Sequence, residues 1–560
     1  MQIIKSFAKL LVFVLPLPAM SQTTFLQQGD KAYQLIDRLE IKAQNNTHLN
    51  FSTLKPYSRE AMLQEVQAID STRKSLQLSK IDAYNMQRLY MNNVEFYSGD
   101  KSTFKSAHQP VKGFYVNPAN LLQVNTKDFF LTVNPVLQFS MGKQSDYSNR
   151  LFLNTRGVTM RGKLANKIGF SATITDNQER GPLYFRDQVY QYRAVPGVGF
   201  YKGFKQDGFD YFDARGYFTT KVTKYIDVQF GYDKNFIGNG QRSLFLSDWG
   251  NSYLFLKLNT RIWKFNYENI FMELMPQFIR TTDTAIDRKY AAMHHLSMNV
   301  TRWLNIGLFE GVIFGRKNHF DFQYLNPIIF YRHIEGTLGS PDNALAGIDF
   351  KANVAKRVQV YGQLLLDEFK LDQIKANTGW WANKWGFQLG AKYIDAFGIP
   401  NLDLQVESNR VRPFTYSHNN IISNYTHYNQ PLAHPLGSSF QEFIGIVKYQ
   451  PAPKWYVNAR VIAYMKGLDS SFAGRNYGSN PFRVQSDYRI GDYGYEIGGG
   501  RKMNAINAVL QVSYEFRENL YFDFTAQYRK YKIANEAAVP AVSTFAAGIR
   551  LNIARRDYDF

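Results

Sequence analysis

The chain has 560 residues, no cysteine, and 66 lysines and arginines against 46 aspartates and glutamates, a formal net charge of +20. The absence of cysteine excludes disulfides, cysteine-ligated metal sites and thiol nucleophiles. The mean hydropathy is −0.36, and no apolar run approaches the ~18 residues of a membrane-spanning helix. Aromatic residues nevertheless make up 16% of the chain, an excess that a set of ordinary soluble domains does not explain.

The N-terminal segment has the pattern of a secretory signal peptide. Lys5 and Lys9 precede the apolar stretch 10–19, which is too short to span a bilayer, and small residues at positions 19 and 21 fit cleavage before Gln22. Prolines at positions 16 and 18 argue against a buried helix. We therefore predict a signal peptide over residues 1–21 and export of the mature chain.

Residues 22–110 have a helical pattern that differs from everything after them. Apolar residues recur at helical spacing, and Ser79 with Asp82 resembles a helix start. Three short amphipathic helices bury little surface by themselves, so we expect them to pack against something larger, although a free three-helix domain remains an alternative. The residues at helical spacing are Tyr33, Ile36, Leu39, Met62, Val66, Ile69, Ile81, Tyr84 and Leu89.

From residue 129 onward the apolar period changes to two. In 226–233 and 519–529, for example, apolar and aromatic residues alternate with polar ones over about ten residues, the length of a tilted strand that crosses a bilayer. Strands of soluble sandwiches are usually shorter, about five or six residues. The alternation therefore favours strands with one face toward lipid and the other toward a polar lumen.

Connection lengths support the same interpretation. Short turns alternate strictly with long connections, as periplasmic turns alternate with external loops in outer-membrane barrels. We predict an all-β protein: a transmembrane antiparallel β-barrel of about 18 strands over residues 111–560, preceded by a small periplasmic α-helical bundle. The lipid face and its aromatic girdles then account for the aromatic excess. The long connections are 177–214, 235–251, 315–344, 409–440 and 466–503.

No catalytic constellation stands out, and we predict no catalytic residue and no cofactor. Gly238-Asn239-Gly240 follows a strand but opens no helix and lacks the lysine of a phosphate-binding loop, so a glycine-rich hairpin tip is the better interpretation. Ser243 and Ser247 lack the glycine context of a hydrolase nucleophile.

The connection 409–440 is the most unusual segment. His418, His427 and His434 fall within it, but their spacing matches no metal-ligand motif, so we predict no metal site. Tyrosines offer flat faces for sugar rings, and arginines offer forked donors for carboxylates. We therefore predict an acidic-polysaccharide site, while a loop that folds back to plug the lumen remains an equal alternative, and both can hold together. The candidate site residues are Arg410, Arg412, Tyr416, His418, Tyr425, His427 and Tyr428.

The positive charge indicates partners rather than a fold. Loss of the signal peptide removes only Lys5 and Lys9, so the mature chain keeps a charge of about +18. Anionic glycolipids, including lipopolysaccharide, and acidic surface polymers are the expected partners outside the cell. Export argues against nucleic acid.

Several strings resemble a known family. Six of them are 35–41 (L-I-D-R-L-E-I), 54–59 (L-K-P-Y-S-R), 229–248 (Q-F-G-Y-D-K-N-F-I-G-N-G-Q-R-S-L-F-L-S-D), 324–327 (Y-L-N-P), 361–369 (Y-G-Q-L-L-L-D-E-F) and 426–437 (T-H-Y-N-Q-P-L-A-H-P-L-G). These segments resemble the Bacteroidota Wzi-like outer-membrane capsule assembly proteins, a group that includes gliding-motility proteins of the RemB type. The resemblance implies an 18-stranded barrel, a periplasmic helical bundle and a role with surface polysaccharide. It transfers no sugar-contacting residue.

Three functions compete at this point. The first is a non-enzymatic outer-membrane protein that binds or organises capsular or exopolysaccharide. The second is a surface component of gliding motility. The third is a channel for solutes or hydrophobic substrates, with the helices as a periplasmic hatch. Independently of these functions, we expect the helices to offer a docking place for periplasmic or outer-membrane protein partners.

Overall fold

The structure is a computed structural model that describes residues 23–44, 52–71, 76–106, 109, 111–278, 285–327, 330–470 and 474–560. The predicted signal peptide lies outside the described residues and stays a prediction.

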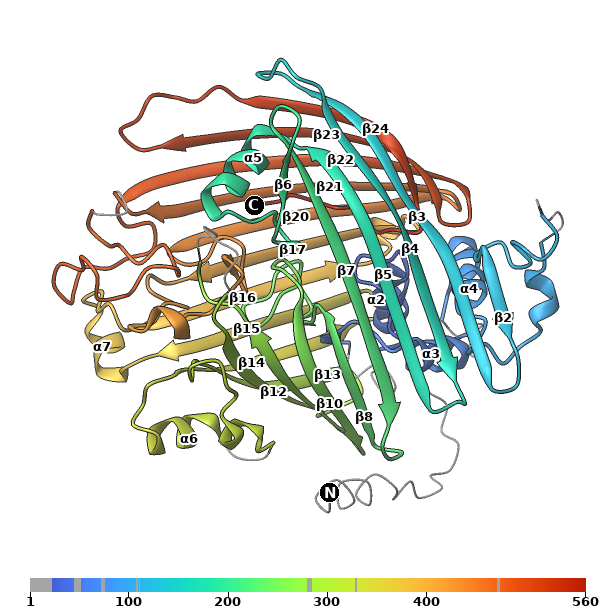
Figure 1. The fold of residues 1–560 in the computed structure, drawn as a ribbon, viewed down its shortest axis with the longest axis horizontal. Coiled ribbons are helices and arrows are strands. Elements are labelled where there is room, and N and C mark those ends of the chain that lie inside the picture. Colours follow the sequence, from blue (N-terminus) through green and yellow to red (C-terminus); the bar gives the residue numbers. More distant parts are fainter. Residues whose placement is uncertain are drawn as a thin grey trace, which may run out of the picture.

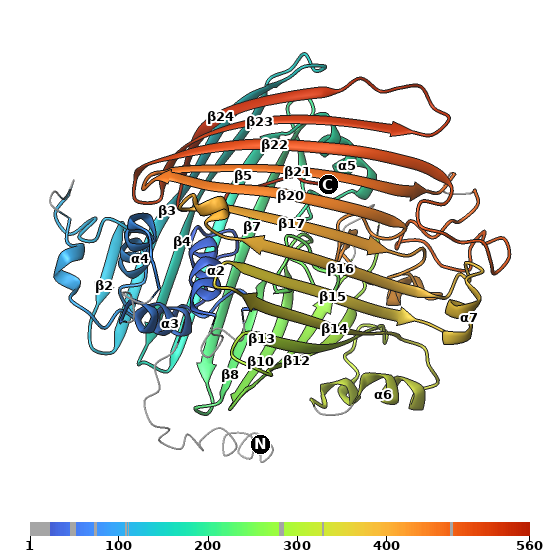
Figure 2. The same cartoon turned by 180° about the vertical axis from the view of Figure 1, so that it is seen from behind.

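Eighteen antiparallel strands form a closed barrel, which confirms the predicted fold class (Figures 1 and 2). Every segment with a period of two became a wall strand, and β24 pairs with β3 to close the wall. The wall strands are β3 (Phe129–Gln144), β4 (Leu151–Leu164), β5 (Ile168–Arg180), β7 (Gly208–Lys221), β8 (Ile226–Asp233), β10 (Tyr253–Ile262), β11 (Phe265–Leu274), β12 (Lys289–Asn299), β13 (Leu304–Phe314), β14 (Asn343–Val354), β15 (Val358–Glu368), β16 (Lys384–Tyr393), β17 (Leu402–Val411), β20 (Phe440–Ala452), β21 (Trp455–Leu468), β22 (Arg501–Arg517), β23 (Leu520–Ile533) and β24 (Val542–Leu551). Short β2 (Leu122–Asn125) and β6 (Lys202–Phe204) add to β3 and β7.

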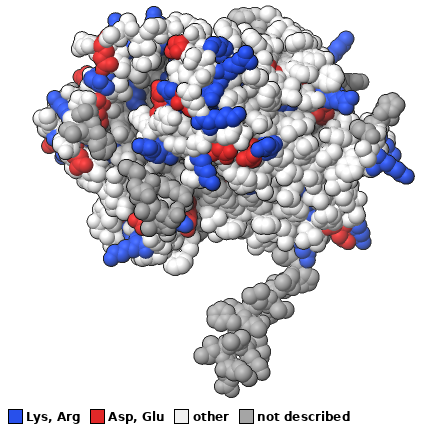
Figure 3. Space-filling model, turned by 45° about the horizontal axis from the view of Figure 1, so that its top comes forward, with Lys and Arg blue, Asp and Glu red and all other residues white. Residues whose placement is uncertain are grey.

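The exterior of the wall is apolar. On β23, Phe522 and Phe524 are exposed, whereas Tyr521 between β22 and β24 is buried. Neighbouring outward positions are apolar as well, since Phe524 lies between Val512 and Ala547. Figure 3 shows broad uncharged areas between separate groups of charged residues. This is the lipid-facing surface that alternation predicts for a transmembrane barrel.

The two ends of the barrel differ as predicted. At one end the strands join through short turns, such as Glu518-Asn519 between β22 and β23. At the other end, the long-loop end, the connections carry α5 (Leu183–Tyr192), η3 (Phe322–Leu325), α6 (Tyr331–Thr337), α7 (Leu371–Ala376) and η5 (Ile421–Ser423). Figure 1 places α6 and α7 opposite the N-terminal helices. The turn 394–401 at the short-turn end contains η4 (Ala396–Gly398).

The N-terminal region contains three helices, α2 (Ala32–Ala43), α3 (Arg59–Ser71) and α4 (Lys80–Asn92), with β1 (Leu54–Lys55) and η2 (Lys101–Phe104). Ile36, Leu39, Met62 and Val66 form its core, as the spacing predicts. Ser79 and Asp82 form the predicted capping box at the start of α4. None of the described helices is long and apolar enough to cross a membrane.

The lumen is filled by the protein's own connections. β9 (Phe236–Ile237) pairs with β1 inside the barrel, and a small hairpin of β18 (Thr426–His427) and β19 (Gln430–Pro431) lies in the connection between β17 and β20. These segments pack on inward-facing wall residues in one apolar cluster, in which Phe245 stacks on Phe309 at 4.5 Å between ring centroids.

The facing of β23 gives a test of the membrane assignment. Phe524→Arg places a charge on the lipid face, which costs about 2–4 kcal/mol near mid-bilayer, and we expect a reduced yield of folded barrel. Thr525→Arg is the matched control, because Thr525 borders a luminal cavity. Heat-modifiable electrophoretic mobility after refolding into vesicles measures the folded fraction. Equal yields for the two variants would contradict the facing.

Candidate functional site

The connection 412–439, called here the luminal loop, enters the barrel. Tyr416 and Tyr425 are 2% and 1% exposed, and their rings stack with centroids 5.5 Å apart. Their hydroxyls donate to the main-chain carbonyls of Leu244 (2.8 Å) and Phe245 (2.6 Å). The structure therefore assigns these two predicted sugar platforms to filling of the lumen, the alternative that the sequence left open, and neither ring has an accessible face.

The three histidines of this loop face different partners. His427 donates from Nε2 to the carbonyl of Ser252 and accepts at Nδ1 from the main-chain N–H of Met275, both at 3.0 Å. Burial lowers the pKa of His427 to about 4, so the ring is neutral at pH 7. His434 contacts Glu442 at 2.8 Å, and half-buried His418 accepts from the N–H of Asn420. Within the described residues, no group of three histidine, aspartate or glutamate side chains could hold a metal ion.

The two predicted arginines lie in different environments. Arg410 is exposed on β17 and pairs across the sheet with outward-facing Phe387, which places it on the outer wall near the long-loop end. Arg412 turns inward and donates to the carbonyls of Asn383 (2.8 Å), Trp380 (3.2 Å) and Tyr495 (3.1 Å). Burial lowers the pKa of Arg412. Arg412 therefore links the luminal loop to the two connections that contain Asn383 and Tyr495.

Tyr428 is the remaining predicted residue. It is half-buried and packs perpendicular to Phe278, with ring centroids 4.9 Å apart. The seven predicted residues therefore do not converge on one surface.

The sequence analysis placed no candidate site residue in two of the loops that Arg412 joins. Residues 369–383 and 474–500, called here the outer rim, are paired by main-chain hydrogen bonds: Trp381 to Asp492, Gly494 to Thr378 and Tyr495 to Gly379, each 2.9 Å. The pairing leaves three large side chains in solvent at the long-loop end. They are Tyr488, Ile490 and Tyr493, with exposed fractions of 60%, 62% and 53%.

Arginines lie against aromatic rings in the outer rim. The Arg489 guanidinium lies 3.7 Å from the ring centroid of Trp381, and Arg483 lies 5.2 Å from that of Tyr488. The segment 483–496, R-V-Q-S-D-Y-R-I-G-D-Y-G-Y-E, contains the same residue types that drew attention to 409–440. That signal was available in the sequence, and only the paired loops reveal that its rings stay exposed.

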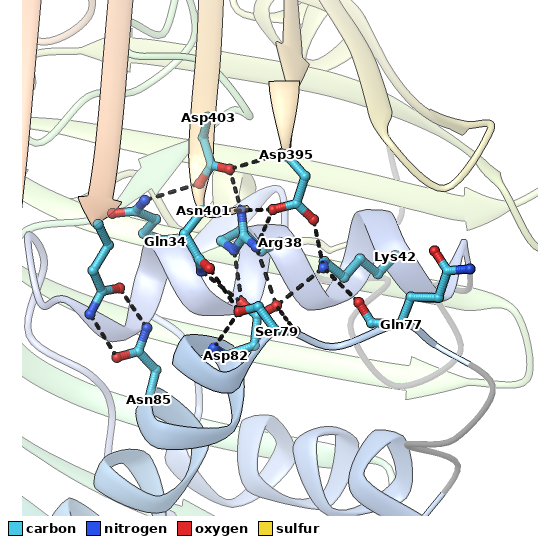
Figure 4. Close-up of polar contacts among 11 residues, drawn as sticks. Gln34, Arg38, Lys42, Gln77, Ser79, Asp82, Asn85, Asp395, Asn401 and Asp403 are labelled. Carbon is cyan, nitrogen blue, oxygen red and sulfur yellow. Dashed lines mark hydrogen bonds and ion pairs between the residues drawn. The ribbon is translucent and has the colours of Figure 1, made fainter. Parts of the chain in front are cut away.

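The opposite end of the barrel is closed by the N-terminal helices. Arg38 of α2 contacts Asp82 of α4 at 3.0 Å, Asp395 of the turn 394–401 at 2.8 Å, and Asp403 of β17 (Figure 4). Lys42 reaches Asp82 at 3.1 Å and Asp395 at 2.7 Å. Two cations and three carboxylates thus join the helices to the wall, and Arg38 and Asp82 are buried.

The electrostatics of this cluster are favourable despite its burial. Burial by itself raises the pKa of Asp82, but Arg38 and Lys42 outweigh it and lower that pKa to about 2. The same cations lower the pKa of Asp395. Both carboxylates are therefore ionised at neutral pH.

Further ion pairs surround the cluster and join the helical region to many strands. They are Lys31 with Glu515 and Glu518, Arg88 with Glu518, Lys392 with Asp37, Lys351 with Glu40, Lys221 with Glu60, and Arg161 with Glu95, at 2.6–3.2 Å. The helical region is thus a docked part of the barrel rather than a free domain.

A barrel with an apolar exterior, a filled lumen, helices docked at one end and an aromatic rim at the other defines a class: plugged transmembrane β-barrels. The family model "Capsule assembly protein Wzi" matches residues 140–540, and the chain belongs to this family. No curated protein sequence matches the chain.

Three solved structures resemble the chain, and the first of them supports the fold. Escherichia coli Wzi, described as an outer-membrane protein involved in group 1 capsule assembly and a carbohydrate-binding β-barrel, is 12% identical, with a TM-score of 0.55 over 95% of this chain and 100% of that one. OprD of Pseudomonas aeruginosa is also 12% identical, with a TM-score of 0.41 over 80% of this chain and 97% of that one. OccAB2 of Acinetobacter baumannii is 9% identical, with a TM-score of 0.41 over 75% of this chain and 97% of that one. The last two scores are too low to support an argument about function.

Removal of Arg38 should loosen the helical region. Arg38→Ala leaves buried carboxylates with Lys42 as their main counter-charge, and loss of one partner of a buried pair costs about 3–5 kcal/mol. We expect faster proteolysis within residues 23–106 and unchanged protection of the strands. Arg501→Ala is the control: its pair with Glu536 is exposed, and such pairs contribute about 0–1 kcal/mol. Identical cleavage rates for both variants would contradict the role of Arg38.

The same cluster predicts an acid threshold. The folded-state pKa of Asp82 lies below its ordinary 3.8, so its stabilising contribution is complete above about pH 4 and is lost as pH falls through about 2. Pepsin digestion of refolded protein should therefore leave the helices intact at pH 4 and remove them near pH 2. Asp82→Asn should abolish this threshold. Release of the helices at pH 5 in the wild type would contradict the assignment.

Proposed function

We propose that the protein is a non-enzymatic outer-membrane barrel that binds or organises an acidic cell-surface polysaccharide, capsular or exopolysaccharide, and thereby assists capsule assembly. The observation that carries the proposal is the outer rim, where tyrosines stay exposed beside arginines on a member of the capsule assembly family. The description of E. coli Wzi as a carbohydrate-binding barrel supports the same function.

The proposed location follows from the exterior of the barrel and the predicted signal peptide. An apolar wall of antiparallel strands with short turns at one end suits the bacterial outer membrane, with the long loops outside and α2, α3 and α4 in the periplasm. Arg410 on the outer wall beside Phe387 would meet the phosphates of lipopolysaccharide headgroups. The periplasmic face of the helices is the proposed docking place for protein partners.

The rim suits an acidic glycan for two chemical reasons. The C–H faces of sugar rings pack on flat aromatic side chains such as Tyr488 and Tyr493. Uronate carboxylates accept paired hydrogen bonds from guanidinium groups. Contacts with Trp381 at 3.7 Å and with Asp492 at 3.3 Å restrain Arg489, so little side-chain entropy is lost when it binds. Phe414 of the luminal loop packs against Trp381 and Tyr495 of the rim, with ring centroids 5.9 and 5.1 Å apart, and so supports the rim.

A gliding-motility role of the RemB type remains an alternative prediction, as does membership of the Bacteroidota group. Movement of a labelled protein along the cell would favour it. In a deletion strain, the capsule function instead predicts that polymer is still made but is shed into the medium, and a normal cell-bound capsule would contradict our proposal.

Binding of isolated cell-surface polysaccharide to the purified barrel tests the rim. Tyr488→Ala/Tyr493→Ala should weaken binding about tenfold, because aromatic contacts contribute about 0.5–1.5 kcal/mol each beyond area burial. The matched control is Phe322→Ala/Phe330→Ala, which removes two exposed rings from the connection between β13 and β14.

Two further variants separate the sequence-predicted site from the rim. Arg489→Gln should weaken binding, whereas Arg410→Ala should leave polysaccharide binding unchanged and reduce association with lipopolysaccharide. Absence of binding by the wild type would contradict the proposed function. Equal loss in the phenylalanine control would contradict the location.

A further inference from the structure

The C-terminal tail, residues 552–560, turns into the barrel after β24 ends at Leu551. The chain ends inside the barrel in both opposite views (Figures 1 and 2). Residues 554–560 form neither helix nor strand, and Asp559 and Phe560 are buried. The tail therefore adds nothing to the wall, and side-chain contacts must hold it in the lumen.

Arginines of the wall and of the connection 234–252 contact the acidic end of the tail. Asp559 contacts Arg242 at 2.9 Å and Arg460 at 3.5 Å, and Arg460 also reaches Asp557 at 3.5 Å. Arg529 donates to the main-chain oxygen of Phe560 at 2.5 Å. The segment 557–560 carries two side-chain carboxylates, which pair with Arg242 and Arg460.

Aromatic contacts complete the seat of the tail. The Tyr558 ring lies 4.2 Å from that of Phe185 in α5, and its hydroxyl donates to Glu179 at 2.7 Å. The Phe560 ring lies 5.7 Å from Trp249 and 5.8 Å from Tyr184, both in edge-to-face geometry. The tail is thus anchored on long connections that themselves belong to the long-loop end.

Three luminal cavities meet at the tail. One of about 420 Å³ extends toward the N-terminal helices, one of about 270 Å³ toward the long-loop end, and one of about 160 Å³ along β3, β23 and β24. Arg555 and Asp557 line all three. The tail therefore separates these three spaces, together with residues 27–29, which line the first two.

The cavity of about 420 Å³ has more cations than carboxylates in its lining. Most of these cations pair with carboxylates, as Lys31 does with Glu515 and Arg215 with Asp213, but two of them donate to neutral oxygens. Arg59 donates to the carbonyl of Phe25 and to Asn93, and Lys234 donates to the carbonyl of Asp248. A polar space with fixed positive charge concentrates small anions and repels small cations.

We propose that the C-terminal tail is a plug that closes a luminal path for small anions. Charge holds the plug in place, because its carboxylates form ion pairs with arginines that would face the anion in an open path. This path is a second feature, distinct from the rim, because none of the tail contacts involves Tyr488, Tyr493 or Arg489.

Planar-bilayer recording in potassium chloride tests the plug with the full chain. Asp557→Asn/Asp559→Asn keeps the length of the tail and removes its ion pairs with Arg242 and Arg460, while Arg555 keeps its pair with Asp523. We expect the open fraction to rise about a hundredfold over that of the wild type, with chloride more permeant than potassium. Truncation after Arg556 should do the same, since β24 stays intact. Asp287→Asn/Glu536→Gln is the control, because these two carboxylates are exposed and contact Asn318 and Arg501 rather than the tail.

The absence of native cysteine permits a reversible lock. Phe185→Cys/Tyr558→Cys, introduced into the asparagine variant and bridged by a bifunctional thiosulfonate, should be silent and should open when reductant is added. Heat-modifiable mobility confirms that each barrel is folded. A folded asparagine variant and truncation that both stay silent would overturn the plug, as would a wild type that conducts equally. Selectivity for potassium would overturn the anion path.

Discussion

A closed hydrogen-bonded wall is the constraint on which the rest of this structure depends. No water is available inside a bilayer to satisfy an exposed strand edge, so β24 must pair with β3. Closure with eighteen strands produces a lumen too wide for inward side chains to fill. Other parts of the chain must occupy that space or leave it to water, and this protein fills much of it with the connection 234–252, the luminal loop and the C-terminal tail.

Filling a polar lumen with polar loops requires paired charges. Glu407 of β17 accepts from the main-chain N–H groups of Gln241 (2.7 Å) and Arg242 (3.1 Å), so a buried carboxylate occupies the turn after Gly238-Asn239-Gly240. A Cβ on Gly240 would lie 2.3 Å from that carboxylate, so a larger residue there would have to displace the Glu407 side chain. The glycine-rich string is thus not a solvent-exposed hairpin tip. It is a close contact between loop and wall that buries a charge with its hydrogen bonds satisfied.

The sequence predicts the wall better than the site, for a physical reason. Strand facing is a local property, so the alternation around Phe522 and Phe524 predicts their lipid-facing side from a few residues. The capping box of Ser79 and Asp82 predicts the start of α4 in the same way. The fate of a loop tyrosine depends on distant partners. Tyr416 and Tyr425 are buried because the carbonyls of Leu244 and Phe245 lie opposite, whereas Tyr488 is exposed because its loop pairs with residues 378–381. Both segments combine tyrosines with arginines, and only tertiary contacts determine which tyrosines are buried.

The net charge also changes meaning once the pairs are known. Arg38, Arg242 and Arg460 are buried against carboxylates, and the cations around the largest cavity face the lumen. An excess of +20 therefore does not by itself describe the surface that a polysaccharide meets. In our proposals, recognition at the rim depends on a few arginines held against aromatic rings, and closure of the lumen depends on the carboxylates of the tail. Because these two sets share no residue, we expect binding outside and passage inside to be separable by mutation.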